Sequence, residues 1–141
     1  MMPWTTPKTN WTAQDYEDCA DWNRQKDNIQ HLATEVLPSL YYFPEHTEIA
    51  DADELTLPTV SLVNTLEGNL AALTAAGLPS PDGWQDPKTW SAGDAPDYTD
   101  VNRWEISAWL YDDMAQRIRA RHHVAGTIAA GQADILPRRA T

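Results

Sequence analysis

The feature that most constrains this chain is a stretch near its start that recurs, without a gap, near its end. Residues 11–24 read WTAQDYEDCADWNR, and residues 90–103 read WSAGDAPDYTDVNR. The matched positions that matter below are Trp11 with Trp90, Asp15 with Asp94, Asp18 with Asp97, Asp21 with Asp100, Asn23 with Asn102, and Arg24 with Arg103. A repeated sequence predicts a repeated local structure, in which similar units pack on one another.

A third, weaker copy lies between these two. Residues 64–70, NTLEGNL, follow the pattern of residues 23–29, NRQKDNI, although the tryptophan and the first aspartate are missing. We therefore divide a single helical domain, residues 1–141, into copies at about 8–37, 57–77 and 87–123 and a C-terminal tail, 124–141. The tail is weakly patterned, and we expect it to lie over the helices or to dock on a neighbour.

Each copy carries a signal for the start of a helix. Asp18, Thr59 and Asp97 stand five residues before the shared asparagine, and each side chain can accept a hydrogen bond from the free amides of a first helical turn. Asp21 and Asp100 follow three residues after the cap, where a carboxylate reaches back to the cap amide and favours the positive end of the helix dipole. The sequence thus predicts three capped helices.

Apolar residues recur at alternating steps of three and four after each cap, which is typical of helices that pack side by side. The predicted seams are Trp22, Gln25, Ile29, Leu32 and Val36; Val63, Leu66, Leu70, Leu73 and Gly77; and Val101, Trp104, Ala108, Tyr111, Ala115 and Ile118. Only Gln25 interrupts the pattern. The predicted fold is therefore all-α, a three-helix bundle made from an internally repeated capped-helix motif.

The helix ends follow from proline, glycine and charge. The first helix is expected from Asp18 to Val36, before a Leu-Pro pair, and the second from Thr59 to Ala76, with Gly77 as its C-terminal cap. The third is expected from Asp97 into the basic region 117–123, which suits the negative pole of the helix dipole.

The connections, residues 38–57 and 78–96, are longer than a helix bundle needs and are rich in proline and tryptophan. Loops of this length are usually functional or packed by their own aromatic side chains. Residues 41–43 are a candidate for a short strand. We take Trp4, Tyr41, Tyr42 and Trp84 as candidate interface residues, because aromatic side chains with a polar group suit partner surfaces.

Charge and cysteine content exclude several classes of protein. The chain has 21 acidic and 10 basic side chains, and a net charge of −11 opposes binding to nucleic acids and to anionic membranes. The one cysteine, Cys19, excludes an internal disulfide and a cysteine-based metal site. The N-terminus does not resemble a signal peptide, and no stretch approaches the length of a membrane span.

The residues that carry chemistry elsewhere have simpler explanations here. The adjacent His122 and His123 point about 100° apart on a helix, so they do not readily share one metal ion. The acidic run at residues 51–54 lacks the glycine and the distal glutamate of a calcium loop, which leaves a solvated loop, or adventitious calcium. The aspartates at cap spacing are explained by capping. We expect no catalytic residue, metal or cofactor.

The two Asn-Arg pairs have two interpretations. They lie beside the predicted seam, where they either tie each helix to the tryptophan-containing loop that precedes it or make contacts across a subunit boundary. We favour the internal tie, because a repeated unit needs a repeated internal contact.

The pattern W-x-x-G-D followed by D-x-N-R-x-E resembles a motif of virion proteins from phages that infect Gram-positive bacteria, where it recurs in tail, baseplate and fibre-associated proteins. The third copy fits in full, with Trp90, Gly93, Asp94, Asp100, Asn102, Arg103 and Glu105. The first copy has Gln14 for the glycine and Lys26 for the glutamate, and the middle copy keeps only Asn64 and Glu67. The resemblance covers about half of the chain.

This resemblance implies a non-enzymatic assembly component of a phage particle or phage-like tail device, made in the host cytoplasm and located in the virion. Its partners would be other virion proteins and further copies of itself, because such arrays are symmetric. One alternative is a tryptophan-rich glycan-binding module for cell-surface attachment, which requires exposed, coplanar tryptophans in the loops. Another is a small hydrolase, which requires two acidic side chains converging in a cleft.

Overall fold

A computed structural model of the protein describes residues 4–55 and 58–131, with side chains as far as Arg121. Within these residues the chain is helical and contains no strand, so the prediction of an all-α protein is confirmed. The helical elements are α1 (Cys19–His31), the π-helical turn η1 (Leu32–Val36), α2 (Leu37–Ser39), α3 (Val60–Ala75) and α4 (Tyr98–Gly131). The first three elements are continuous and form one long helix.

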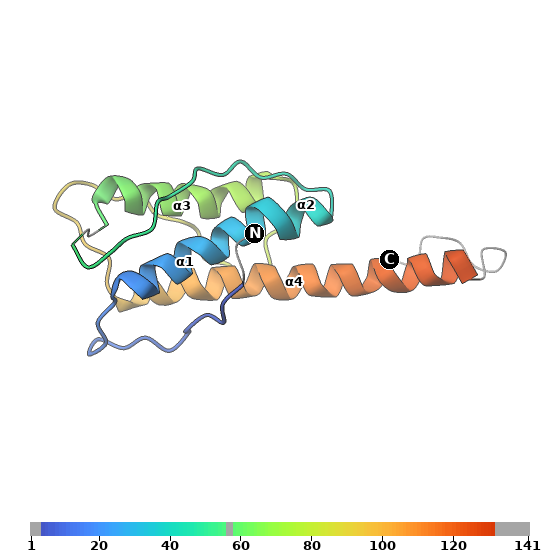
Figure 1. Ribbon diagram of the computed structural model, residues 1–141, viewed down its shortest axis with the longest axis horizontal. Helices are drawn as coiled ribbons and strands as arrows, with labels where there is room; N and C mark the ends of the chain where they lie inside the picture. The colour runs from blue at the N-terminus through green and yellow to red at the C-terminus, as the bar shows by residue number, and fades with distance from the viewer. Residues whose placement is uncertain (1–3, 56–57, 132–141) are drawn as a thin grey trace.

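The helices α1, α3 and α4 lie side by side and begin at the same end of the molecule, on the left of Figure 1. Helices that point in the same direction need connections that return along their full length. The 16 residues of α3 rise about 24 Å, a distance that an extended chain covers in about seven residues. This return path accounts for part of the length of the connections that the sequence contains.

The helix starts agree with the sequence prediction. Asp18 caps α1 through a hydrogen bond from the amide of Asp21, and Thr59 caps α3 through one from the amide of Leu62. At the other end of α3, Gly77 adopts a φ of +106°, a left-handed conformation that favours glycine, so the predicted C-terminal cap is confirmed.

The end of the first helix differs from the prediction. The helix continues through Pro38 to Ser39 instead of ending at Val36. A proline ring inside an α-helix clashes with the carbonyl four residues earlier, and the π-helical turn before Pro38 widens the helix at that point. The chain then turns at Tyr41, whose φ is +66°, and residues 41–43 form no strand.

The last helix also differs from the prediction, because α4 continues past His123 to Gly131 and extends beyond the ends of α1 and α3 (Figure 1). Residues 124–131, VAGTIAAG, include three alanines, the best helix former, and a single glycine within a helix costs only about 1 kcal/mol. The predicted tail is therefore partly helical, and its remainder, residues 132–141, lies outside the described residues.

The core contains most of the predicted seam residues and also buried residues from outside the seams: Trp11, Ala33, Leu37, Leu40, Ile49 and Leu78. Trp22 of α1 packs edge-on against Trp104 of α4, with ring centroids 6.2 Å apart. Gln25, which interrupts the seam, is buried as well and donates a hydrogen bond to Glu105. Two seam positions near helix ends are not fully buried, Gly77 and Ile118.

In the described part of the chain, no helix is long and apolar enough to cross a membrane.

Candidate functional site

The shared asparagine of each helix holds the backbone of an extended segment by two hydrogen bonds. Asn102 of α4 accepts a bond from the Trp11 amide at 2.8 Å and donates one to the Trp11 carbonyl at 2.9 Å. Asn64 of α3 binds the amide and carbonyl of Trp90 in the same way, at 2.7 and 2.9 Å. We call this pair of bonds an asparagine clamp.

The third clamp joins the first helix to the segment before α3. Asn23 of α1 accepts a hydrogen bond from the Ala52 amide at 2.8 Å and donates one to the Ala52 carbonyl at 3.0 Å. The prediction that these asparagines tie a helix to a loop of the same chain therefore agrees with the observed hydrogen bonds. The expectation that each helix binds the loop before it is wrong, because all three clamps reach a loop that precedes another helix.

A second set of clamps lies five residues further along two of the helices. Asn28 of α1 binds the amide and carbonyl of Thr5, and Asn69 of α3 binds those of Thr47, all at 2.7–2.9 Å. The corresponding residue of α4 is Ser107, which is buried. We assigned no role to Asn28 and Asn69 from the sequence, although their shared distance from Asn23 and Asn64 was a usable signal.

The arginine beside the first asparagine forms an ion pair between α1 and α4 in which the glutamate is fully buried and the arginine partly so. Arg24 binds the Glu105 carboxylate with two nitrogens, Nε at 2.9 Å and Nη2 at 2.6 Å. The same carboxylate accepts bonds from the Trp11 indole at 2.7 Å and from the Lys8 amide at 3.0 Å. Glu105 is 1% exposed, so its charge is balanced by these partners rather than by water.

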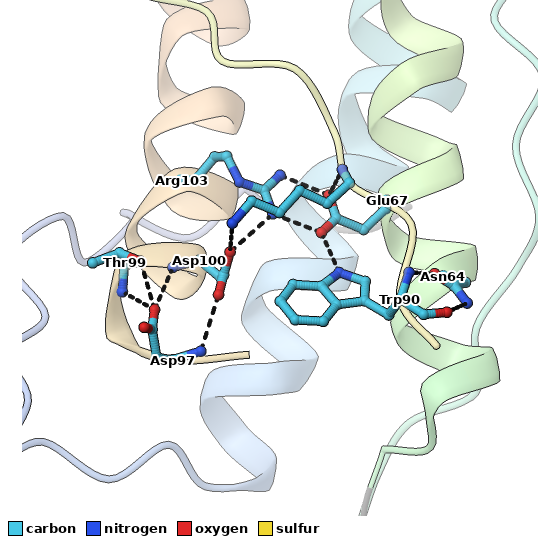
Figure 2. A network of polar contacts seen from close by, with 8 residues as sticks. Asn64, Glu67, Trp90, Asp97, Thr99, Asp100 and Arg103 are labelled. Carbon is cyan, nitrogen blue, oxygen red and sulfur yellow. Dashed lines mark hydrogen bonds and ion pairs between the residues drawn. The ribbon is translucent and has the colours of Figure 1, made fainter. Parts of the chain in front are cut away.

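An equivalent cluster joins α4 to α3 (Figure 2). Both terminal nitrogens of Arg103 lie 2.6 Å from the oxygens of Glu67, which also accepts bonds from the Trp90 indole at 2.7 Å and the Lys88 amide at 3.2 Å. Asp100 contacts Arg103 at 3.4 Å and the Lys88 ammonium at 2.8 Å. The aligned tryptophan, arginine and glutamate residues of two copies, together with the amide of a lysine shortly before each tryptophan, thus form the same contact between different pairs of helices.

The third position in this series contains different residues. Thr65 of α3 stands where the other copies have arginine, and Lys26 of α1 stands where they have glutamate. Lys26 is 3% exposed and pairs with Asp27 at 2.7 Å and with Asp51 at 2.6 Å. The contact between α1 and α3 therefore lacks the arginine-carboxylate pair, and a lysine-aspartate contact lies there instead.

The electrostatics of the Glu67 cluster favour the charged forms. Burial alone would raise the pKa of Glu67, but the hydrogen bonds from Arg103 and Trp90 and the positive charge of Arg103 outweigh it and hold the pKa below its usual range. Burial likewise opposes the charge on Arg103, and its carboxylate partners raise its pKa despite that. Both groups are therefore ionised across the physiological pH range.

The remaining motif residues shape the chain before each helix. The Asp15 carboxylate accepts a hydrogen bond from the Thr12 amide at 2.8 Å, and Asp94 accepts one from the Ser91 amide at 2.9 Å, which closes a turn in each copy. The turn of the third copy uses Gly93 at a φ of +93°.

The two capping boxes are closed from both sides. Asp21 accepts a hydrogen bond from the Asp18 amide and Asp100 accepts one from the Asp97 amide, both at 3.0 Å, as predicted. The hydrogen bond from the Asp21 amide lowers the pKa of Asp18, and hydrogen bonds from the Thr99 hydroxyl and from the amides of Thr99 and Asp100 lower the pKa of Asp97.

Three of the four candidate interface aromatics pack against the protein itself. Trp84 meets Tyr111 edge-on, with ring centroids 5.1 Å apart, and Trp4 lies 6.2 Å from the ring of His31. Tyr42 is partly buried against the core, and only Tyr41 is largely exposed. Other exposed aromatic or aliphatic side chains were not singled out from the sequence: Tyr16, Phe43, Leu55 and Trp109.

Chemically, the carboxylates of the motif are engaged within the protein, although the buried Nε of Arg103 has no hydrogen-bond partner. The carboxylates of the motif accept hydrogen bonds from backbone amides, indoles and guanidinium groups of the protein itself. Among the described residues, no three histidine, cysteine or acidic side chains are grouped to hold a metal ion.

Comparisons of the chain with protein-family models, curated proteins and solved structures give no match.

Proposed function

We propose that the protein is a non-enzymatic structural component of a phage particle or phage-like tail device, located in the virion. The observation that carries this proposal is the use of the motif. Its tryptophan, aspartate, asparagine, arginine and glutamate side chains all form internal contacts that hold helices to extended segments, as in the Glu67 cluster. A motif used in this way supports a rigid building block better than a reactive centre.

We also propose that the architecture is a three-helix bundle assembled from three related units. The support is the agreement between sequence alignment and contacts. Asn23, Asn64 and Asn102 occupy aligned positions, and each clamps the backbone of one extended segment. Arg24 and Arg103 are also aligned, and each binds a glutamate on a neighbouring helix.

The partners in this proposal are other virion proteins and further copies of the chain, without nucleic acid or membrane. The high negative charge supports a docking role toward basic surfaces and opposes binding to phosphate backbones. The long α4, which extends past α1 and α3, gives the molecule a projecting element for such contacts (Figure 1).

The glycan-binding alternative has less support. It requires loop tryptophans with free, coplanar faces, but Trp84 packs on Tyr111 and the Trp90 indole is bonded to Glu67. The most exposed of the described tryptophans, Trp109, lies on α4 rather than in a loop. We therefore do not propose this function.

The test is quantitative mass spectrometry of gradient-purified particles from the producing strain, which counts copies of this protein against the major particle proteins. We expect a fixed copy number that is compatible with particle symmetry. The matched control is the same preparation from a strain in which the gene carries an early stop codon. Absence of the protein from washed particles would overturn the proposal and would make binding to host cell walls the next measurement.

A further inference from the structure

A pocket opens at the end of the molecule where α1, α3 and α4 begin. Its volume is about 540 Å³, which is the size of a small-ligand site or a short peptide segment. Apolar side chains from all three helices and from the N-terminal segment line it: Trp11, Trp22, Val63, Val101 and Trp104. Nothing in the structural role of the motif requires an open apolar space at this position.

Acidic side chains line the same pocket. Asp15, Glu17 and Asp97 contribute to its wall and are exposed to solvent. Two aromatic side chains lie nearby in the sequence, Tyr98, which lines the pocket and is 41% exposed, and Tyr16, which is 93% exposed. An apolar cavity with acidic and aromatic groups at its edge suits a segment that presents apolar side chains together with basic ones.

The chain itself contains such a segment at the other end of α4. Residues 117–141 have five arginines and one aspartate, whereas residues 1–116 have five basic and twenty acidic side chains. Residues 132–141 read QADILPRRAT. In this segment, Ile135 and Leu136 stand directly before Pro137 and two arginines. Its apolar and basic residues therefore complement the apolar wall and the acidic edge of the pocket.

This segment cannot reach the pocket of its own chain. The pocket lies beside Tyr98, at the start of α4, and the 34 residues of α4 rise about 50 Å from there to Gly131. The ten residues beyond Gly131 span at most about 36 Å when fully extended. An occupant of this pocket with the chemistry of residues 132–141 therefore comes from a second copy.

We propose that the pocket at the start of the helices receives residues 132–141 of a second copy of this chain. The apolar pair Ile135 and Leu136 suits the apolar lining of the pocket, and the charges of Arg138 and Arg139 suit its acidic edge. This contact joins different surfaces of the two copies, so it extends into a ring or an open array rather than ending at a dimer. The inference rests on the proposed function, which makes the protein an assembly component, and it names a second copy of the chain as one of its partners.

The test is sedimentation velocity of the purified full-length chain between about 2 and 200 μM in low salt, a range that brackets micromolar affinity. We expect a mass above that of one chain, which rises with concentration and falls when salt screens the charges. Ala13→Arg places a bulky cation in the pocket wall and leaves the chain monomeric. Ala50→Arg is the matched control, because Ala50 is exposed and does not line the pocket, and it associates like the original chain.

A mixture of two defective variants tests the direction of the contact. Ala13→Arg keeps an intact C-terminal segment, and Leu136→Asp keeps an intact pocket, so each alone is monomeric and an equal mixture forms a heterodimer. Circular dichroism checks that both variants fold. A chain that stays monomeric at every concentration would overturn the inference, as would equal effects of Ala13→Arg and Ala50→Arg, or a mixture that stays monomeric. None of these outcomes depends on finding the protein in a particle, so this test is separate from that of the proposed function.

Discussion

At the scale of single residues, the asparagine clamp shows why one residue type recurs. A carboxamide has one acceptor oxygen and one donor nitrogen on the same group, which matches the donor and acceptor of one backbone residue. Asn102 satisfies both polar groups of Trp11 in this way, and Trp11 is otherwise buried without a strand partner. Aspartate lacks the donor, so it cannot replace asparagine here even though its shape is the same.

We expect Asn102→Ala to lower the free energy of unfolding by about 2–3 kcal/mol, because it leaves the amide and the carbonyl of Trp11 without partners. Asn102→Asp should cost at least as much, since a carboxylate would face the Trp11 carbonyl. Urea unfolding followed by tryptophan fluorescence measures both. Asn10→Ala, at an exposed neighbouring position, is the control and should change stability by less than about 0.5 kcal/mol. Equal stability of the Asn102 and Asn10 variants would contradict the clamp.

Tyr41 is a second position where a single residue affects the free energy of unfolding, through its backbone conformation. Its φ of +66° costs roughly 1 kcal/mol for a side chain with a Cβ atom, and the ring is largely exposed, so little packing offsets that cost. Tyr41→Gly should therefore raise the free energy of unfolding by about 0.5–1 kcal/mol. Phe43→Gly, at an exposed position without a positive φ, should lower it. Thermal unfolding of the two variants compares them, and a loss of stability in Tyr41→Gly would contradict the argument.

At the scale of elements, ion pairs with buried carboxylates join neighbouring helices. Arg103 and Glu67 are 5% and 2% exposed, and together they join α4 to α3. Breaking a buried pair by removing one charge is strongly destabilising, because the other charge stays buried without its partner. These pairs therefore matter more for the arrangement of the helices than the exposed ion pairs of the surface, such as that between Arg117 and Asp113.

The Glu67 pair gives the protein a defined acid sensitivity. The pKa of Glu67 is lowered in the folded state, so its contribution to stability is fully present above the unfolded value near 4.5 and is lost as the pH falls through the folded value. Glu67→Gln should lower the free energy of unfolding by about 3 kcal/mol at pH 7. The difference between this variant and the original chain should shrink between pH 5 and the acid range.

Urea unfolding at pH 7, 5 and 3 measures this dependence. Glu45→Gln, at an exposed glutamate, is the control and should follow the original chain at every pH. If the Glu67→Gln difference is the same at pH 7 and pH 3, the ionised carboxylate is not the stabilising group.

At the scale of the whole molecule, the sequence predicts local structure and buried faces but not the partners of the polar ties. The caps at Asp18 and Thr59 and the seam through Leu66 depend on residues a few positions apart, so a single sequence contains them. The clamp between Asn102 and Trp11 depends on which helix lies beside which segment, 91 residues away in the chain. Alignment shows that Asn102 and Asn23 are equivalent, but equivalence does not reveal that each binds the loop of another helix.

The C-terminal ends of the first and last helices are the other part that the sequence predicts incorrectly. Pro38 is a reliable stop signal only for a regular α-helix, and the π-helical turn before it removes the clash on which the rule depends. The basic region 117–123 is likewise a weak stop signal, because basic side chains favour the end of a helix without requiring one. In both cases the local signal favours the end of a helix, but the neighbouring residues allow the helix to continue.

The proposed repeat makes a prediction about the contact between α1 and α3, which lacks the arginine-glutamate pair of the other two contacts. Arg24 pairs with a glutamate of α4 and Arg103 with a glutamate of α3, so the next pair in this order would join position 65 of α3 to position 26 of α1. Lys26→Glu alone should destabilise the protein by about 2–3 kcal/mol, because it buries a carboxylate and breaks two ion pairs. Thr65→Arg alone should cost about 1 kcal/mol, because the proposed repeat places position 65 opposite Lys26, so the new cation would face another cation.

The double variant should recover stability, because the new arginine and glutamate then form the pair found in the other two positions. A double-mutant cycle from urea unfolding should give a favourable coupling energy of about 2 kcal/mol. Ser61→Arg, one helical turn before Thr65 and exposed, replaces Thr65→Arg in the control cycle and should couple to Lys26→Glu by less than about 0.5 kcal/mol. Equal coupling in the two cycles would mean that positions 26 and 65 do not correspond to the Arg24 and Arg103 pairs, and the three helices would then not be related by one repeated contact.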